Sequence, residues 1–164
     1  MMPTDVTPRG FVLGPTEGRL SAPLNVVGEP TLVKVSAADT GGAVSVFHLT
    51  APRFTGPPLH VHTREDETFY VLDGEVVFEI DGARVTTGAG SVVCLPRGIP
   101  HRYQNFSEHP AQLLLVVTPG TGFEAFFGEL AAATPPQGGV PPMDVLSRID
   151  ATYGLTTLGP PMFE

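Results

Sequence analysis

The chain has no tryptophan, and it has only one lysine (Lys34) and one cysteine (Cys94). Its 9 basic residues stand against 17 acidic ones, which gives a formal net charge of −8. Since binding to a phosphate backbone needs clustered lysine and arginine, we expect no nucleic-acid partner. A lone cysteine cannot close an internal disulfide, which is typical of proteins of the cytoplasm, where we expect this one to be localised.

Long apolar runs are also missing. No stretch approaches the roughly 20 apolar residues that span a membrane as a helix. The first eleven residues, MMPTDVTPRGF, have neither the basic nor the apolar region of a secretory signal. We therefore expect no signal segment and no membrane partner.

Glycine (19) and proline (18) are abundant and spread along the chain, which favours many short strands joined by turns. Asp-Gly pairs at 73–74 and 81–82 separate alternating apolar runs, the strongest short hairpin signal. The sequence predicts about nine strands. One is a short edge strand at 11–13, and the others lie at 31–36, 43–51, 67–72, 75–80, 83–87, 91–95, 101–105 and 111–118. A hairpin turn is expected at 38–42.

The two ends differ from this strand-rich body. Five prolines make residues 1–30 an expected irregular N-terminal arm, before a β-barrel at 31–120. Residues 121–164 are predicted to form a helical appendage and tail, with a first helix capped by Thr121 and Glu124. A second helix would begin at Asp144 and end at Gly154.

Two histidines, His60 and His62, are spaced by one residue where a strand is expected to start. In a strand such residues point to the same side. Glu67 follows after a polar bend, TRED, and can return beside them from the next strand. Arg64, Glu65 and Asp66 of this bend are expected to form a solvated loop, with Glu65 as the fallback carboxylate should Glu67 not reach. Two ordinary surface histidines beside a charged loop are the alternative for this pair.

A third histidine, His101, stands at another expected strand start. Three imidazoles and one carboxylate suit a divalent transition metal ion, namely iron, nickel, manganese, cobalt or zinc. Four protein ligands leave positions open for a substrate, whereas a closed structural zinc site uses mostly thiolates. We expect one such ion per chain, whose identity stays open. His48 and His109 are interpreted as bystanders.

Two stretches resemble the motifs of the cupins. The first cupin motif, with its pattern HXH, E and G, fits HVHTREDETFYVLDG at 60–74, except that its leading glycine should fall at Phe54 and the chain offers Gly56 instead. The second fits GSVVCLPRGIPHRYQN at 90–105 at every position. This resemblance spans about residues 43–118.

The resemblance implies an all-β fold, a double-stranded β-helix (jelly roll or cupin barrel) followed here by the two-helix appendage. It makes His60, His62, Glu67 and His101 the metal ligands. It gives the turns to Gly74, Gly90, Pro96 and Gly98, and a structural role to Asn105. If Glu67 and His101 point inward, strand alternation adds Phe69 and Tyr103 to a substrate pocket and Val71 to the pocket or the core.

The amino-acid sequence of the first motif and the Phe-rich helix after the last strand resemble those of the quercetin 2,3-dioxygenase-like cupins. That implies a metal-dependent dioxygenase that cleaves a flavonol-like or other enolisable aromatic small molecule with dioxygen, with Glu67 as catalytic base. Two alternatives stay open, an isomerase, cyclase or decarboxylase of a small metabolite and a non-catalytic metal-dependent binding protein. Because open sheet edges can pair between copies, we expect a homodimer.

Overall fold

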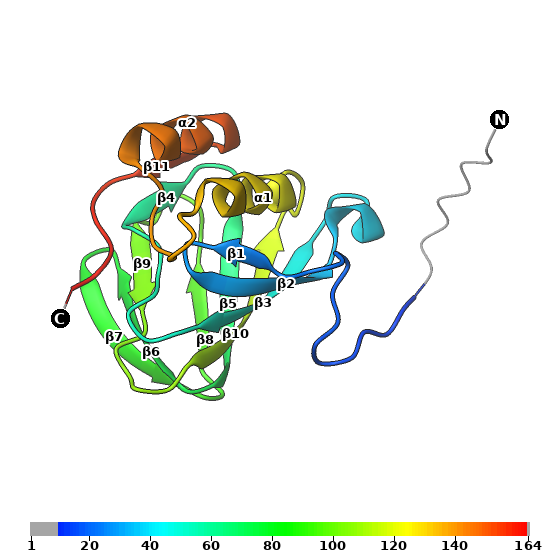
Figure 1. The fold of residues 1–164 in the computed structure, drawn as a ribbon, viewed down its shortest axis with the longest axis horizontal. Coiled ribbons are helices and arrows are strands. Elements are labelled where there is room, and N and C mark those ends of the chain that lie inside the picture. Colours follow the sequence, from blue (N-terminus) through cyan, green and yellow to red (C-terminus); the bar gives the residue numbers. More distant parts are fainter. Residues whose placement is uncertain (1–9, 164) are drawn as a thin grey trace.

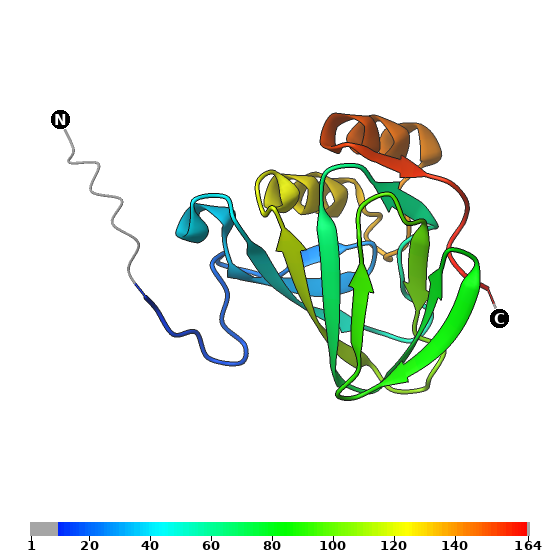
Figure 2. The same cartoon turned by 180° about the vertical axis from the view of Figure 1, so that it is seen from behind.

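Two antiparallel sheets lie face to face in the computed structural model, which describes residues 10–163 (Figures 1 and 2). One has six strands in the order β1-β2-β3-β10-β5-β8, and the other has five in the order β11-β4-β9-β6-β7. No hydrogen-bonded ladder connects the two sheets within residues 10–163, so the jelly roll is an open sandwich and not a closed barrel. The mostly-β class is confirmed.

The larger sheet consists of β1 (Leu24–Val26), β2 (Glu29–Val35), β3 (Ser45–Ala51), β10 (Ala111–Thr118), β5 (Asp66–Asp73) and β8 (Val92–Leu95). The smaller sheet consists of β11 (Leu155–Thr157), β4 (His60–His62), β9 (His101–Gln104), β6 (Glu75–Ile80) and β7 (Ala83–Gly88). A short 3-10 helix covers Ala37–Thr40, and the α-helices are α1 (Phe123–Ala133) and α2 (Met143–Tyr153).

The core lies between the sheets because the strands alternate in burial. In β3 and β10 every second side chain is buried, so that Phe47 and Leu49 meet Leu115 and Leu113 on the inner face. The residues between them face outward, as a period of two requires. This alternation also decides which side chains can reach the space between the sheets.

Both helices lie across one end of the sandwich (Figures 1 and 2). Phe123, Phe126 and Phe127 of α1 are buried, and so are Leu146 and Ile149 of α2. After Gly154 ends α2 in the left-handed conformation, the chain forms β11 and pairs with β4. The appendage is thus continuous with the five-stranded sheet. No helix in the described part of the chain is long and apolar enough to cross a membrane.

The expectation of an irregular arm over residues 1–30 fails at its C-terminal end. Residues 24–26 form β1, and β2 begins at Glu29, two residues before the expected start of the barrel at 31. The connection is a tight turn in which Val27 and Gly28 both have positive φ, at 49° and 97°. Such a two-residue loop is a common hairpin connection, but valine is rare in it, so the sequence carries no turn signal there. Residues 1–9 of the arm and Glu164 of the tail lie outside the described residues.

The hairpin around residues 38–42 is confirmed, since β2 pairs antiparallel with β3, and its connection contains the 3-10 helix, which Ser36 caps. Three local predictions are wrong. Residues 11–13 form no strand. Helix α1 follows Gly122 without a side-chain cap, because Glu124 instead accepts a hydrogen bond from the distant backbone N–H of Ala37. Helix α2 begins after Pro142 and not at Asp144.

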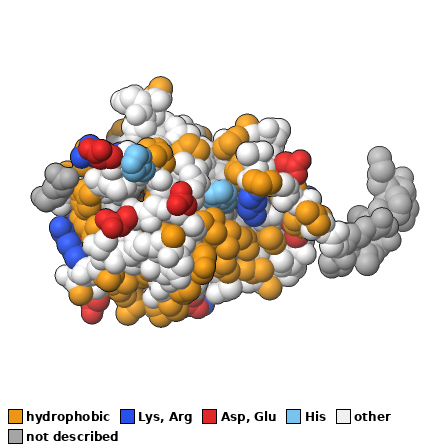
Figure 3. Space-filling view, turned by 90° about the horizontal axis from the view of Figure 1, so that it is seen from below, with side chains coloured by type: hydrophobic (Ala, Val, Ile, Leu, Met, Phe, Trp, Pro, Cys, Tyr) orange, Lys and Arg blue, Asp and Glu red, His pale blue; other side chains and the backbone are white. Residues whose placement is uncertain are grey.

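Apolar side chains also reach the surface. Seen from below, they gather over a broad area with acidic and basic side chains scattered around it (Figure 3). On the outer face of the larger sheet, Tyr70 and Leu72 of β5 and Val92 of β8 are exposed, and Tyr70 pairs with Val92 across the two strands. An apolar outer face of this kind is a candidate contact surface.

Gly56 explains the departure from the first motif. A Cβ atom at this position would lie 1.9 Å from the backbone oxygen of Tyr103, so the chain can pass β9 only with a glycine there. We expect Gly56→Ala to lower the free energy of unfolding by about 1–3 kcal/mol or more, as overpacking does. Denaturant unfolding measures this. Gly88→Ala is the control, since a Cβ there meets nothing within 4 Å; equal stabilities for the two variants would contradict the explanation.

Candidate metal centre

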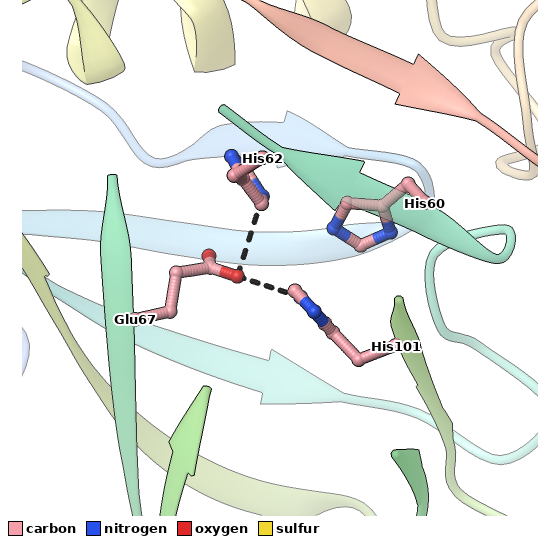
Figure 4. Close-up of side chains that lie close together, drawn as sticks. All are labelled: His60, His62, Glu67 and His101. Atoms are coloured by element: carbon pink, nitrogen blue, oxygen red, sulfur yellow. Dashed lines mark hydrogen bonds and ion pairs between the residues drawn. The ribbon is translucent and has the colours of Figure 1, made fainter. Parts of the chain in front are cut away.

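Three strands bring the four residues together (Figure 4). His60 and His62 occupy both ends of β4 and face the same side, and Glu67 reaches them from β5 in the opposite sheet. His101 is the first residue of β9 and lies directly opposite His60 in the antiparallel pairing. All four side chains are buried.

The polar atoms of these side chains converge on one point. Oε2 of Glu67 lies 2.9 Å from Nε2 of His101 and 3.3 Å from Nε2 of His62. One ligand atom from each of the four residues lies within 4.8 Å of all the others. Ligand atoms about 2 Å from a common ion are themselves about 3–4 Å apart, so a small contraction suffices to hold one.

The second ring nitrogen of each histidine is already engaged. Nδ1 of His60 donates to the carbonyl oxygen of Pro58 at 2.8 Å, and Nδ1 of His101 donates to that of Ile99 at 2.9 Å. Nδ1 of His62 lies 3.4 Å from Oε2 of Glu65. Such bonds fix the orientation of each ring and turn Nε2 inward, where its lone pair would become available once an ion displaces any hydrogen on it, as in established metal sites.

The charges of the group are strongly coupled. Burial, together with the neighbouring His101 and His62, lowers the pKa of His60 to about 3, so its ring is neutral. Burial also disfavours a charge on His62, yet Glu67 and Glu65 outweigh it and raise the pKa of His62 to about 9. Against its own burial, the carboxyl of Glu67 has its pKa lowered well below the usual value by His62 and His101.

These observations fit a divalent transition metal ion. The donor set is three imidazole nitrogens and one ionised carboxylate, all pointing inward and held by hydrogen bonds from behind. The chemistry of the donors does not distinguish iron, nickel, manganese, cobalt and zinc.

The four residues lie at the wall of an apolar cavity of about 70 Å³. The predicted pocket residues Phe69 and Tyr103 line it, whereas Val71 belongs to the core. Residues from both helices complete the wall, among them Phe123, Phe126, Phe127 and Leu146. The rings of Phe123 and His62 are stacked, with their centroids 5.7 Å apart.

One prediction near the site is wrong. The sequence predicts that Glu65 lies in a solvated loop and serves as a ligand only if Glu67 does not reach the histidines. Glu65 is instead buried and lies behind His62. Its neighbour Asp66 is the residue at the surface, where it pairs with Arg97. His48 lies outside the group and contacts Gln112, and Asn105 donates hydrogen bonds to the carbonyl oxygens of Ala51 and His109.

Sequence reasoning missed two acidic residues of the cavity. Glu29 comes from β2 and accepts a hydrogen bond from the hydroxyl of Tyr103 at 2.5 Å. Asp150 comes from α2 and accepts hydrogen bonds from the backbone N–H and the hydroxyl of Thr157. Burial raises the pKa of Asp150 above its usual value. Neither residue stands in a motif, and the only signal was an acidic residue within an apolar pattern.

Comparison with known proteins gives a consistent result. Residues 47–117 match the family model described as "Cupin domain", which covers both histidine motifs. Quercetin 2,3-dioxygenase of Bacillus subtilis is 32% identical over 72 residues, which are 44% of this chain and 21% of that protein. Germin-like protein 1-1 of rice is 36% identical over 104 residues, 60% of this chain and 46% of that protein.

Among solved structures, a predicted oxalate decarboxylase from Thermotoga maritima aligns with a TM-score of 0.54 at 26% identity, covering 60% of this chain and 92% of the other. The curated relatives are each matched over less than half of their own length. The similarity therefore concerns the part of the fold that holds the four residues.

We expect the purified full chain to bind one divalent ion through these side chains. His60→Ala combined with His101→Ala should abolish stoichiometric binding of Zn²⁺ or Ni²⁺, because half of the donors are lost. Metal content after dialysis, measured by mass spectrometry, checks this. His48→Ala is the matched control and should bind like the unaltered chain. Metal content unaffected by the double substitution would overturn the ligand assignment.

The same series tests the residue behind His62. Glu65→Gln should keep one ion per chain but weaken binding by about 10–100-fold, as the loss of an outer partner does. Competition with a chromophoric chelator measures the affinity. An unchanged affinity would show that Glu65 does not orient His62.

Proposed function

We propose that the protein is a cupin and a metal-dependent dioxygenase of an enolisable aromatic small molecule, flavonol-like in its binding group, because residues 47–117 match the cupin domain. The observation that carries the proposal is the position of the donor set, which lies at the wall of a partly enclosed apolar cavity. The similarity to quercetin 2,3-dioxygenase supports it.

The proposal assigns distinct tasks to the residues of the cavity. His60, His62, Glu67 and His101 would hold the ion, which supplies a Lewis acid centre with coordination positions left for small molecules. Phe69 and Tyr103 would contact the aromatic body of the substrate. The phenylalanines of α1 would keep water out, which strengthens each polar interaction inside.

Glu67 would be both a ligand and the catalytic base. Its low pKa keeps it ionised throughout the neutral range but makes it a weak base, so it would take the proton of an enol whose hydroxyl is itself made acidic by the ion. One of its oxygens faces both His62 and His101, and a carboxylate has further lone pairs to offer. The enolate that results would be the species that reacts with dioxygen.

The size of the cavity supports a second candidate. Sites for drug-sized ligands measure about 300–1,000 Å³, whereas this cavity measures about 70 Å³. A complete flavonol therefore requires α1 and α2 to move outward, while a metabolite of a few atoms does not. This favours, as the alternative, an isomerase, cyclase or decarboxylase of a small enolisable metabolite, or a metal-dependent protein that binds such a metabolite without converting it.

Oxygen uptake with a graded series of enols distinguishes these functions. We expect the Ni²⁺- or Fe²⁺-loaded chain to consume oxygen with a substrate of the series, which runs from a single-ring 3-hydroxy-4-pyranone to a complete flavonol. Glu67→Gln should lower the rate about 100-fold or more, the usual contribution of a positioned base. His48→Ala should leave it unchanged.

The outcomes differ for the two candidates. Oxygen consumption that follows ring number would support the flavonol-like substrate, and consumption restricted to single rings would support a smaller aromatic one. Bound metal without oxygen consumption by any member of the series would refute the dioxygenase and leave the second candidate.

We also propose that the protein works in the cytoplasm as a homodimer. The apolar side chains of Tyr70, Leu72 and Val92 on the outer face of the larger sheet support a contact with a second copy. Light scattering after size exclusion should give twice the chain mass of 17.3 kDa. Leu72→Glu should give the monomer, because a carboxylate cannot be buried unpaired at low cost. A monomeric unaltered chain would refute the proposal.

A further inference from the structure

The hydroxyl of Thr55 joins the carboxyl group of Glu29 to a backbone carbonyl oxygen. Oγ1 of Thr55 lies 3.0 Å from Oε1 of Glu29 and 2.8 Å from the carbonyl oxygen of Pro52. A threonine hydroxyl has one hydrogen to donate, and a carbonyl oxygen can only accept. The hydroxyl can therefore donate to an ionised Glu29, or donate to Pro52 and accept the proton of a protonated Glu29, so this contact suits the transfer of a proton.

The surroundings of Glu29 favour this protonated form. The side chain is 1% exposed and has no cationic partner among its hydrogen bonds. Burial raises the pKa of Glu29 to about 7, although the hydroxyls of Tyr103 and Thr55 act in the opposite direction. The carboxyl group can therefore hold or release a proton near neutral pH.

Glu29 also lies between the cavity and a groove on the surface. It lines the cavity that contains the metal-binding residues, while Thr55 lines a shallow groove on the surface, together with Pro52, Gln137 and Gly138. The order of contacts is therefore cavity, Glu29, Thr55 and surface groove. No other residue intervenes between the carboxyl group and the hydroxyl that borders the groove.

We propose that Glu29 is a second proton-carrying residue of this cavity, which exchanges its proton with the surface through the hydroxyl of Thr55. A ligand in the cavity gives a proton to Oε2, which accepts from Tyr103 and keeps another lone pair. In the same concerted step the proton on Oε1 passes to Oγ1 of Thr55, whose own hydrogen turns from the carbonyl oxygen of Pro52 to water in the groove, so the carboxyl group never carries two protons. One O–H bond breaks for each that forms, and no oxidant is required.

This role complements the one proposed for Glu67. Glu67 can take the proton of the group that binds the ion, whereas Glu29 serves a second hydroxyl or amine on the same ligand. The substrate class is thereby narrowed to molecules that carry a second hydroxyl or amine besides the group that binds the ion. The inference rests on the proposed function only in taking this cavity as the reaction site.

Other titratable side chains share the cavity with Glu29. They are Tyr103 and His101 from β9, His60 and His62 from β4, Glu67 from β5 and Asp150 from α2. Only Asp150 is another carboxyl group with a raised pKa. A measurement must therefore assign the proton to Glu29 by substitution.

Infrared difference spectroscopy of the full chain provides that measurement without turnover. At pH 6 we expect the carbonyl band of a protonated carboxylic acid, which Glu29→Gln removes and Asp150→Asn leaves. The band should titrate with a midpoint of about 7 in the metal-free and in the Zn²⁺-loaded chain. A spectrum without this band, or a band untouched by Glu29→Gln, would overturn the proposal even if the protein consumes oxygen as proposed.

The role of Thr55 is tested by the rate of proton exchange. Thr55→Val removes the hydroxyl through which the proton leaves, so the band should take about tenfold longer to shift after the chain is transferred to D₂O. Because the hydroxyl of Thr55 also lowers the pKa of Glu29, the midpoint should rise in this variant. Thr55→Ser should restore both values. An exchange rate that Thr55→Val leaves unchanged would refute the relay.

Discussion

A buried carboxylate among three imidazoles is the constraint on which this structure depends. An unpaired charge in the interior costs several kcal/mol, so Glu67 is tolerated only because His62 and His101 stand against it. That requirement fixes the distance between β5 of one sheet and β4 and β9 of the other. The backbone carbonyl groups that hold His60 and His101 from behind extend the constraint into the adjoining loops.

The sequence predicted the part of the site that local rules determine. Residues two apart in a strand share a face, which placed His60 with His62 and Phe69 with Glu67, and Asp-Gly pairs marked the hairpins. The distance from Glu67 to His101 needed the resemblance to a known family, because strand pairing between sheets leaves no local pattern. The same limit explains the error at Glu65, whose burial depends on its contact with His62.

What remained unpredicted consists of long-range contacts. Glu29 meets Tyr103 from 74 positions away, and Glu124 turns from capping its own helix to binding the backbone at Ala37, 87 positions away. Strand β11 forms by antiparallel pairing with the outer edge of β4. Its three residues, which directly follow a helix, give no strand signal by themselves. At Glu124 and in β11, a tertiary contact with a backbone group determined the local structure, and the intrinsic propensity of the residues did not.

The position of the matched segment determines how much of the function can be inferred from sequence similarity. The residues that would hold the ion all lie within 47–117, the segment that matches the cupin domain. Much of the remaining cavity wall comes from outside that segment, namely Glu29 from β2, Phe126 from α1, and Leu146 and Asp150 from α2. Similarity in the matched segment therefore supports the metal chemistry and says little of the substrate. The size and polarity of the substrate depend on the hairpin before the domain and on the helices after it, which are the parts of this chain that must be compared to find its reaction.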